Sequence, residues 1–197
     1  MSVGKHNKGK LHRRGGQGNN NSCFNNNGYS LIELVIVLAI IAVIMGTVFY
    51  SIILIFSANA KSTANDIQRA IGDCKVATMG RASAYMELYR DAGNENVYTR
   101  MYVMDSSGSY VPSEPQKVGP RRVTVAYSQD GTSETELAAG DKIAIFFDRA
   151  NGGFTTGTAD DGTTYPIYKA IFVRGGSKHY KIELTKLTGK SEVKVVP

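Results

Sequence analysis

The chain has 197 residues, of which 42% are hydrophobic, and a net charge of +6 at neutral pH. Most of the charge lies near the N-terminus, because the first 28 residues contain five lysines and arginines and no acid. The rest of the chain is almost neutral, so composition does not indicate a basic nucleic-acid-binding domain. The two cysteines, Cys23 and Cys74, predict neither a disulfide framework nor a metal site.

The first 28 residues are dominated by glycine, asparagine and basic side chains. This composition buries too little apolar surface to fold, and we expect a disordered leader. It differs from an ordinary secretory signal, in which a small-residue cleavage site follows the apolar region. In this chain Gly28 precedes the apolar region.

An apolar block follows at residues 31–56, with the sequence LIELVIVLAIIAVIMGTVFYSIILIF and Glu33 as its single charge. About 20 apolar helical residues cross a bilayer core of roughly 30 Å. A buried helix of a soluble protein is the alternative, but a soluble helix of this length shows a polar face. The block therefore predicts a transmembrane helix. The basic residues before it predict a cytoplasmic N-terminus and a C-terminal part outside the membrane.

The helix is expected to continue beyond the membrane. Apolar residues recur at steps of three and four on one face: Ala60, Ala64, Ile67, Ala70, Ile71, Cys74, Ala77 and Ala82. We expect a helix over residues 29–84, ending near residues 80 to 85, and one face of its second half should pack on a domain. About 50 residues at 1.5 Å each give a length of roughly 75 Å.

The junction between leader and helix reads Gly28-Tyr29-Ser30-Leu31-Ile32-Glu33 and leads into the apolar run. This arrangement resembles the processing site of type IV prepilins and pseudopilins. The resemblance implies that a prepilin peptidase, an intramembrane aspartic protease, cuts between Gly28 and Tyr29 and methylates the new N-terminus at Tyr29. It also implies that Glu33 acts in filament assembly by pairing with the Tyr29 amine of a neighbouring subunit.

Glu33 also stands out on physical grounds. An acid at the edge of the hydrocarbon costs about 2.5 kcal/mol or more, so a partner is expected. The alternative is a carboxylate that only reaches back to the membrane interface. The chain departs from many major pilins in having no proline within residues 45–55. The subclass therefore stays open.

From Met86 onward the pattern changes from helical to alternating. We expect about six to eight antiparallel strands, with the clearest patterns at residues 86–88, 97–103, 122–127, 142–147, 167–173, 179–184 and 193–196. Residues 112–120 are interpreted as a proline loop, and residues 128–140 as a polar exposed segment. Gly175-Gly176-Ser177 indicates a hairpin turn. The predicted class is α+β: a long N-terminal helix, with a transmembrane first half, packed on a β-sheet head of residues 85–197.

Lys142 to Val195 loosely resembles the head of H-class minor pseudopilins of type II secretion. In both, a strand ending in Phe-Asp precedes a glycine turn and paired strands run to the C-terminus. This second resemblance covers the head alone.

Three other groups of side chains were weighed as sites in the head. His179 is interpreted as a surface residue rather than a catalytic base. Oxygens in glycine-rich loops fit Ca²⁺ binding or ordinary turn chemistry, with turn chemistry favoured: Asp148, Asn151, Asp160 and Asp161. Four basic residues fit DNA phosphates or solvated strand ends, with strand ends favoured: Arg121, Arg122, Arg174 and Lys178.

The sequence therefore predicts a minor pilin or pseudopilin subunit of a type IV pilus or type II secretion-like filament. We expect no enzymatic activity, cofactor or metal. Expected partners are a prepilin peptidase, other pilins or pseudopilins and the bacterial cell membrane; nucleic acid is not favoured. A pilus-displayed module that binds DNA or surfaces, as in competence, is the alternative. An unrelated single-pass membrane protein or ectoenzyme would keep its N-terminus uncut.

Overall fold

The computed structural model describes residues 29–80 and 83–196. The predicted leader, Gly28 and Ala82 lie outside these residues. Contacts divide the chain after Ala42 into two units. The second unit contains the rest of the helix and all of the strands, and the packing described below lies within it.

One helix, α1 (Leu31–Gly80), forms the N-terminal part of the described chain. It is long and apolar enough to cross a membrane. Its apolar residues from Leu31 to Ile55 are exposed wherever their side chains are described. From Ala60 onward one face is buried, at Ala60, Thr63, Ala64, Ile67, Ile71, Cys74 and Thr78. The expected stripe is therefore confirmed for the described residues, with two buried threonines added, while Ala70 and Ala77 are only partly buried.

The described head has thirteen strands. Those of the first sheet are β1 (Ala84–Arg90), β2 (Val97–Met104), β3 (Tyr110–Pro112), β4 (Gln116–Gly119), β7 (Lys142–Phe147) and β8 (Phe154–Thr155). Those of the second are β5 (Thr124–Ser128), β6 (Thr135–Glu136), β11 (Ala170–Gly175), β12 (Lys178–Thr185) and β13 (Lys190–Val196). A short third pair consists of β9 (Gly157–Thr158) and β10 (Thr164–Tyr165).

All strand pairs are antiparallel. The first sheet has the order β3-β2-β1-β7-β8, with β4 also paired to β2, and the second has the order β13-β12-β11-β5-β6. The α+β class and the helix on an antiparallel head are thus confirmed. The expectation of six to eight strands is wrong, because strands of two to four residues, such as β6 and β8, are too short to show an alternating pattern.

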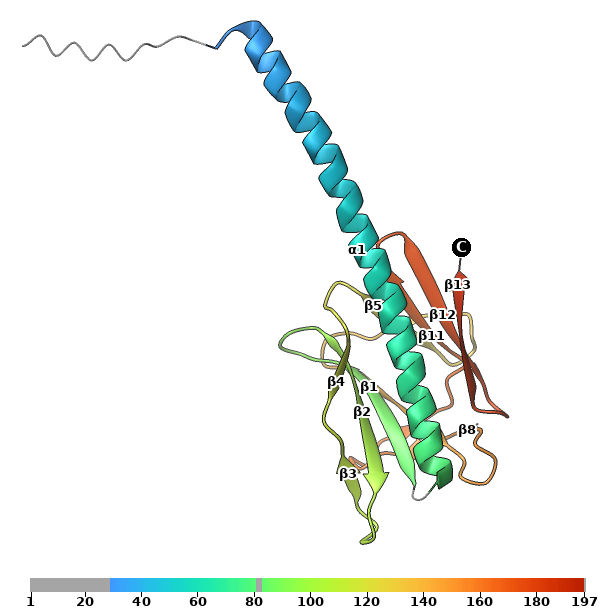
Figure 1. The fold of residues 1–197 in the computed structure, drawn as a ribbon. Helices are drawn as coiled ribbons and strands as arrows, with labels where there is room; N and C mark the ends of the chain where they lie inside the picture. Colours follow the sequence, from blue (N-terminus) through green and yellow to red (C-terminus); the bar gives the residue numbers. More distant parts are fainter. Residues whose placement is uncertain (1–28, 81–82, 197) are drawn as a thin grey trace, which may run out of the picture. The chain divides into compact units, whose positions relative to one another are not determined.

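The helix and both larger sheets share one hydrophobic core. Ile67 and Ile71 of α1, Ile143 and Ile145 of β7, and Ile171 of β11 belong to the same buried cluster. Figure 1 shows α1 running alongside strands of both sheets. This arrangement explains why a narrow stripe of small residues suffices on the helix: the strands pack closely against it, and its other face stays exposed.

The alternating side chains of strand β7 occupy the two faces of the first sheet. Ile143, Ile145 and Phe147 face the shared core, as the sequence predicted. Ala144 and Phe146 point to the other side of the sheet, where they pack with Tyr85 in a second cluster. Both faces of this strand are therefore buried, and the second cluster includes Tyr165 of the β9–β10 hairpin.

Two loop predictions need correction. The proline segment 112–120 contains the last residue of β3 and all of β4, and both strands pair along β2. The segment 128–140 is not uniformly exposed, because Ser128 and Leu137 are buried. Leu137 follows a polar stretch and belongs to no alternating pattern, and its backbone N donates to the Val125 O of β5.

Candidate functional site

The described part of the motif is the start of α1. Ser30 is the residue before the first helical position, and its Oγ accepts a hydrogen bond from the Glu33 backbone N at 3.2 Å. The Ser30 carbonyl accepts from the Leu34 N at 3.1 Å. Ser30 is therefore the N-cap of the helix, and it satisfies donors that would otherwise have no intrahelical partner.

The cap separates Tyr29 from the helix. Tyr29 lies outside α1 and is 81% exposed, and Leu31, the first helical residue, is 82% exposed. The Glu33 side chain is exposed in the first turn, where the helix dipole favours a negative charge. Tyr29 itself is thus exposed and non-helical, and it lies directly before the cap.

Of the motif residues predicted from sequence, Tyr29 and Glu33 lie within one turn of each other, and Gly28 lies outside the described residues. The sequence analysis named Ser30 as part of the motif but missed its role as the helix cap. The signal was available, because Ser followed three residues later by Glu, before an apolar run, is the capping-box pattern of a helix start. The motif thus contains its own helix-start signal, placed directly after the expected cut.

Two of the four basic residues considered as a DNA site form ion pairs. Arg121 pairs with Glu95 at 3.3 Å, and Arg174 pairs with Glu134. His179 lies beside Glu134 with 21% of its side chain exposed, and it accepts from the Arg174 Nε. Burial and the Arg174 charge lower its pKa, which favours a neutral imidazole. Lys178 is exposed.

Most of the oxygens considered as a Ca²⁺ site already have protein partners. Asp148 accepts from the Ala150 N at 2.9 Å and from the Asn151 Nδ2 at 2.8 Å. Asp161 accepts from the Thr163 N and pairs with Lys142 at 2.6 Å. The Asp160 N donates to the Tyr85 hydroxyl. Among the residues that the structure describes, no group of three or more His, Cys, Asp or Glu is placed to hold a metal.

Lys142 also contacts the buried Glu87 at 3.1 Å and so joins the sheet to the β9–β10 hairpin. Its hydrogen bond to Asp161 raises the pKa of the lysine, and the same bond lowers the pKa of Asp161 to about 2. Both groups stay charged near neutral pH. Their contact therefore holds the sheet and the hairpin together.

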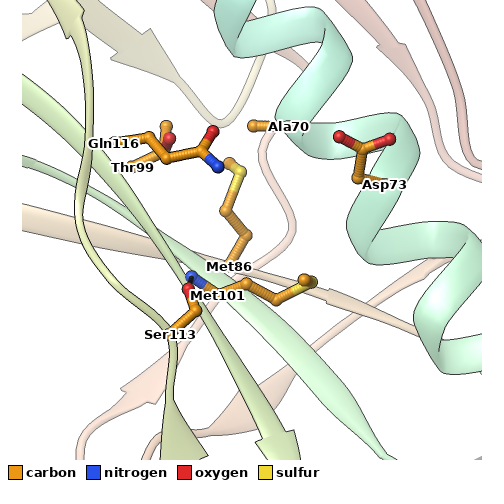
Figure 2. A pocket seen from close by; sticks show the side chains of 7 residues that line it. All are labelled: Ala70, Asp73, Met86, Thr99, Met101, Ser113 and Gln116. Atoms are coloured by element: carbon orange, nitrogen blue, oxygen red, sulfur yellow. Dashed lines mark hydrogen bonds between the residues drawn. The ribbon is translucent and has the colours of Figure 1, made fainter.

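A small cavity lies between α1 and the first sheet. Figure 2 shows Met86 and Met101 extending from the strands toward Ala70 and Asp73 on the helix. Thr99, Ser113 and Gln116 complete the lining, and the volume is about 100 Å³. Ligand pockets for drug-sized molecules are several times larger. The cavity is therefore a small packing defect between α1 and the first sheet, bordered by flexible methionine side chains.

The fold and the motif together define a class: a membrane-anchored protein whose apolar N-terminal helix continues into an α+β head. Residues 23–49 match the family model described as the prokaryotic N-terminal methylation motif. The match is confined to the N-terminal segment, and it supports the predicted resemblance of that segment to type IV prepilins and pseudopilins. Comparison with curated proteins and with solved structures gave no match.

Proposed function

We propose that the chain is the precursor of a minor pilin or pseudopilin. Prepilin peptidase cuts it between Gly28 and Tyr29 and methylates Tyr29. The mature protein waits in the cell membrane with its N-terminus at the cytoplasmic face and its head outside, and it then joins a filament through α1. The observation that carries this proposal is the methylation-motif match over residues 23–49, placed directly at the start of the exposed apolar helix.

The local geometry supports the cleavage step. The proposed scissile bond precedes the Ser30 cap, so cutting it breaks no hydrogen bond of α1. Glycine before the bond permits an extended backbone and leaves room for the enzyme. Cleavage turns the Tyr29 nitrogen into a free amine at the exposed end of a helix whose cap is already formed.

The assembly step uses Glu33. Its carboxylate lies one helical turn beyond Tyr29, in an apolar segment where an isolated charge is unfavourable. In a filament, helices from several subunits pack side by side, and Glu33 of an incoming subunit pairs with the Tyr29 amine of its neighbour. The pair offsets the desolvation of both groups, provided that the two charges are in direct contact.

The processing step is tested with Gly28→Val in cells that contain the peptidase. A β-branched side chain obstructs the site and restricts the backbone, so most of the chain should stay uncut. Gly46→Val is the matched control, because a Cβ at Gly46 meets nothing within 4 Å. Intact mass of the membrane-extracted protein distinguishes the forms. A Gly28→Val product that begins at Tyr29 in normal amounts would overturn the proposed cleavage site.

A further inference from the structure

The head meets the apolar part of α1 at a groove beside Phe56. We call it the junction groove; it has a volume of about 410 Å³ and is lined by Phe56, Asn59, Asn96, Pro120, Arg121 and Arg122. Two residues come from α1, and the others come from the turn before β2 and from the connection between β4 and β5. The groove is thus bordered by aromatic, amide and guanidinium groups.

The position of the groove along α1 fixes its depth relative to a membrane. The apolar block ends at Phe56 and is followed by polar residues. The β11–β12 turn reaches the same level, because a Cβ on Gly176 would lie 2.6 Å from the Ser57 Oγ and 2.7 Å from the Ile53 O. Figure 1 shows this turn and the β4–β5 connection at the end of the head where α1 leaves it toward residue 43. In the membrane-anchored chain, this end lies at the lipid headgroups.

The two arginines are held in place. The Arg122 guanidinium lies over the Phe56 ring, with its carbon 5.2 Å from the ring centre. The Arg121 N donates to the Asn96 Oδ1 at 3.0 Å, and the Val123 N donates to the Pro120 O at 3.0 Å. A connection fixed in this way loses little further freedom on binding a ligand.

Positive charge is in excess at this end. Glu95 offsets Arg121, and Glu134 offsets Arg174 farther along the β11–β12 hairpin. Lys61 and Lys178 are exposed at the same level. Within the part of the chain that the structure describes, Arg122, Lys61 and Lys178 form no ion pair. Guanidinium groups match phosphate oxygens in two-point geometry.

We propose that the junction groove binds the phosphate of an anionic phospholipid headgroup, with Arg122 and Arg121 as its ligands. The lipid belongs to the leaflet on the head's side of the membrane. Binding holds the head against the bilayer while the subunit waits there. The proposal rests on membrane anchoring alone, so it is independent of the cleavage site and of the role of Glu33.

The test uses the full chain in phosphatidylcholine bilayers that contain a trace of spin-labelled phosphatidylglycerol or spin-labelled phosphatidylcholine. Electron paramagnetic resonance measures the fraction of each lipid that the protein immobilises. Wild type should prefer phosphatidylglycerol, and Arg121→Gln/Arg122→Gln should bring the preference close to parity. Each basic residue near a membrane surface contributes about 1 kcal/mol, or about fivefold in affinity. High salt should weaken the wild-type preference.

The control removes two cations from the opposite end of the head. Lys186→Gln/Lys190→Gln alters the β12–β13 turn, where the Thr188 O accepts from Lys75 near the far end of α1. This control should keep the wild-type preference. Equal loss in both double variants would show a general effect of net charge and overturn the groove. So would an unchanged preference in the arginine variant, or no preference in wild type.

Three further measurements keep the result decisive. Circular dichroism shows whether the double variant is folded. If it is not, Arg122→Gln alone takes its place, because this variant preserves the Arg121–Glu95 pair. It should also reduce the preference for phosphatidylglycerol. Inorganic phosphate titrated into the detergent-solubilised chain should not bind measurably; binding that depends on the arginines would assign the groove to free phosphate. Duplex DNA that displaces phosphatidylglycerol through the same residues at low salt would assign it to nucleic acid instead.

Discussion

At the scale of single residues, the head depends on a buried arginine. Arg90, at the end of β1, is 7% exposed. Its guanidinium donates to four backbone carbonyls, those of Leu137, Glu95, Arg121 and Val123, at distances of 2.8 to 3.2 Å. These carbonyls belong to three loops that are far apart in the sequence. One side chain therefore fixes the connections around the junction groove.

Arg90→Met should destabilise the head strongly. Hydrogen bonds from charged donors contribute about 1.5 to 3 kcal/mol each, and buried carbonyls left without partners add a penalty, so we expect a loss of roughly 3 kcal/mol or more. Arg90→Lys should recover only part, because an ammonium lacks the planar fork of donors. Arg69→Met, on the exposed side of α1, should change stability by less than about 0.5 kcal/mol. Urea unfolding of the detergent-solubilised chain, followed by tyrosine circular dichroism, measures all three; equal effects at Arg90 and Arg69 would contradict the assigned role.

The contrast between Arg90 and the N-terminal motif shows what the sequence reveals at this scale. The motif could be predicted from sequence because its residues are contiguous and their spacing is enough to identify it: Gly28, Tyr29 and Glu33. Arg90 is one charged residue in a strand pattern, and nothing near it in the sequence indicates burial. Its carbonyl partners lie between Glu95 and Leu137, so only the folded chain brings them to it.

At the scale of elements, the β11–β12 hairpin is shaped to fit α1. Gly176 and Ser177 form its two-residue turn, with φ of Gly176 at +60°. A glycine at the first central position is typical of a type II′ turn, which matches the twist of paired strands. The same glycine lies against Ser57 and Ile53 of the helix. It therefore meets two requirements, a backbone conformation and a close approach.

These two requirements can be separated by substitution. Gly162 also has positive φ, at +79°, but a Cβ there meets nothing within 4 Å. Gly162→Ala should therefore show only the backbone strain, about 1 kcal/mol. Gly176→Ala should show the same strain and an additional loss of about 1 to 3 kcal/mol from overpacking. Unfolding free energies of both full-chain variants provide the comparison, and equal values would mean that the hairpin does not pack tightly on α1.

Some strands could be predicted from their own sequence pattern, and others are defined only by pairing with strands elsewhere in the chain. The patterns at residues 97–103 and 142–147 predicted β2 and β7 well, because each long strand alternates between two faces. The short strands β3, β4 and β6 were missed because pairing with a neighbour defines them. The division into two sheets was also missed, since alternation shows that a face is buried but not which sheet buries it.

At the scale of the whole molecule, the two halves of α1 have different roles. Its second half is part of the core of the head, through residues such as Ile67 and Ile71. Its first half exposes apolar side chains, and these must be covered by lipid or by other apolar helices. The proposed transfer from membrane to filament would exchange one apolar environment for another, so apolar burial would change little. The choice between the two states then rests on polar groups in this segment, and Glu33 is the charged group among them.

Glu33→Leu tests this role. The cap at Ser30 should survive, because its hydrogen bond comes from the backbone N of residue 33 and not from the side chain. Loss of the favourable dipole contact costs only about 0.3 to 1 kcal/mol, and membrane retention should hold or improve because a charge leaves the apolar segment. Cleavage should persist, since Gly28 and Tyr29 remain.

Incorporation into filaments should fall, because the amine of a neighbouring Tyr29 would be buried without a partner. Breaking one half of a buried pair costs about 3 to 5 kcal/mol, which corresponds to about a hundredfold or more in the distribution between pools. Glu33→Gln should show most of the same loss, since it keeps the shape and removes the charge. Val37→Leu, one turn along the helix, should assemble normally. Fractionation into membrane and sheared-filament pools measures all three variants. Wild-type amounts of the Leu variant in filaments would rule out the pairing role, and they would favour a subunit at the filament tip, where no subunit lies ahead of it to supply the partner.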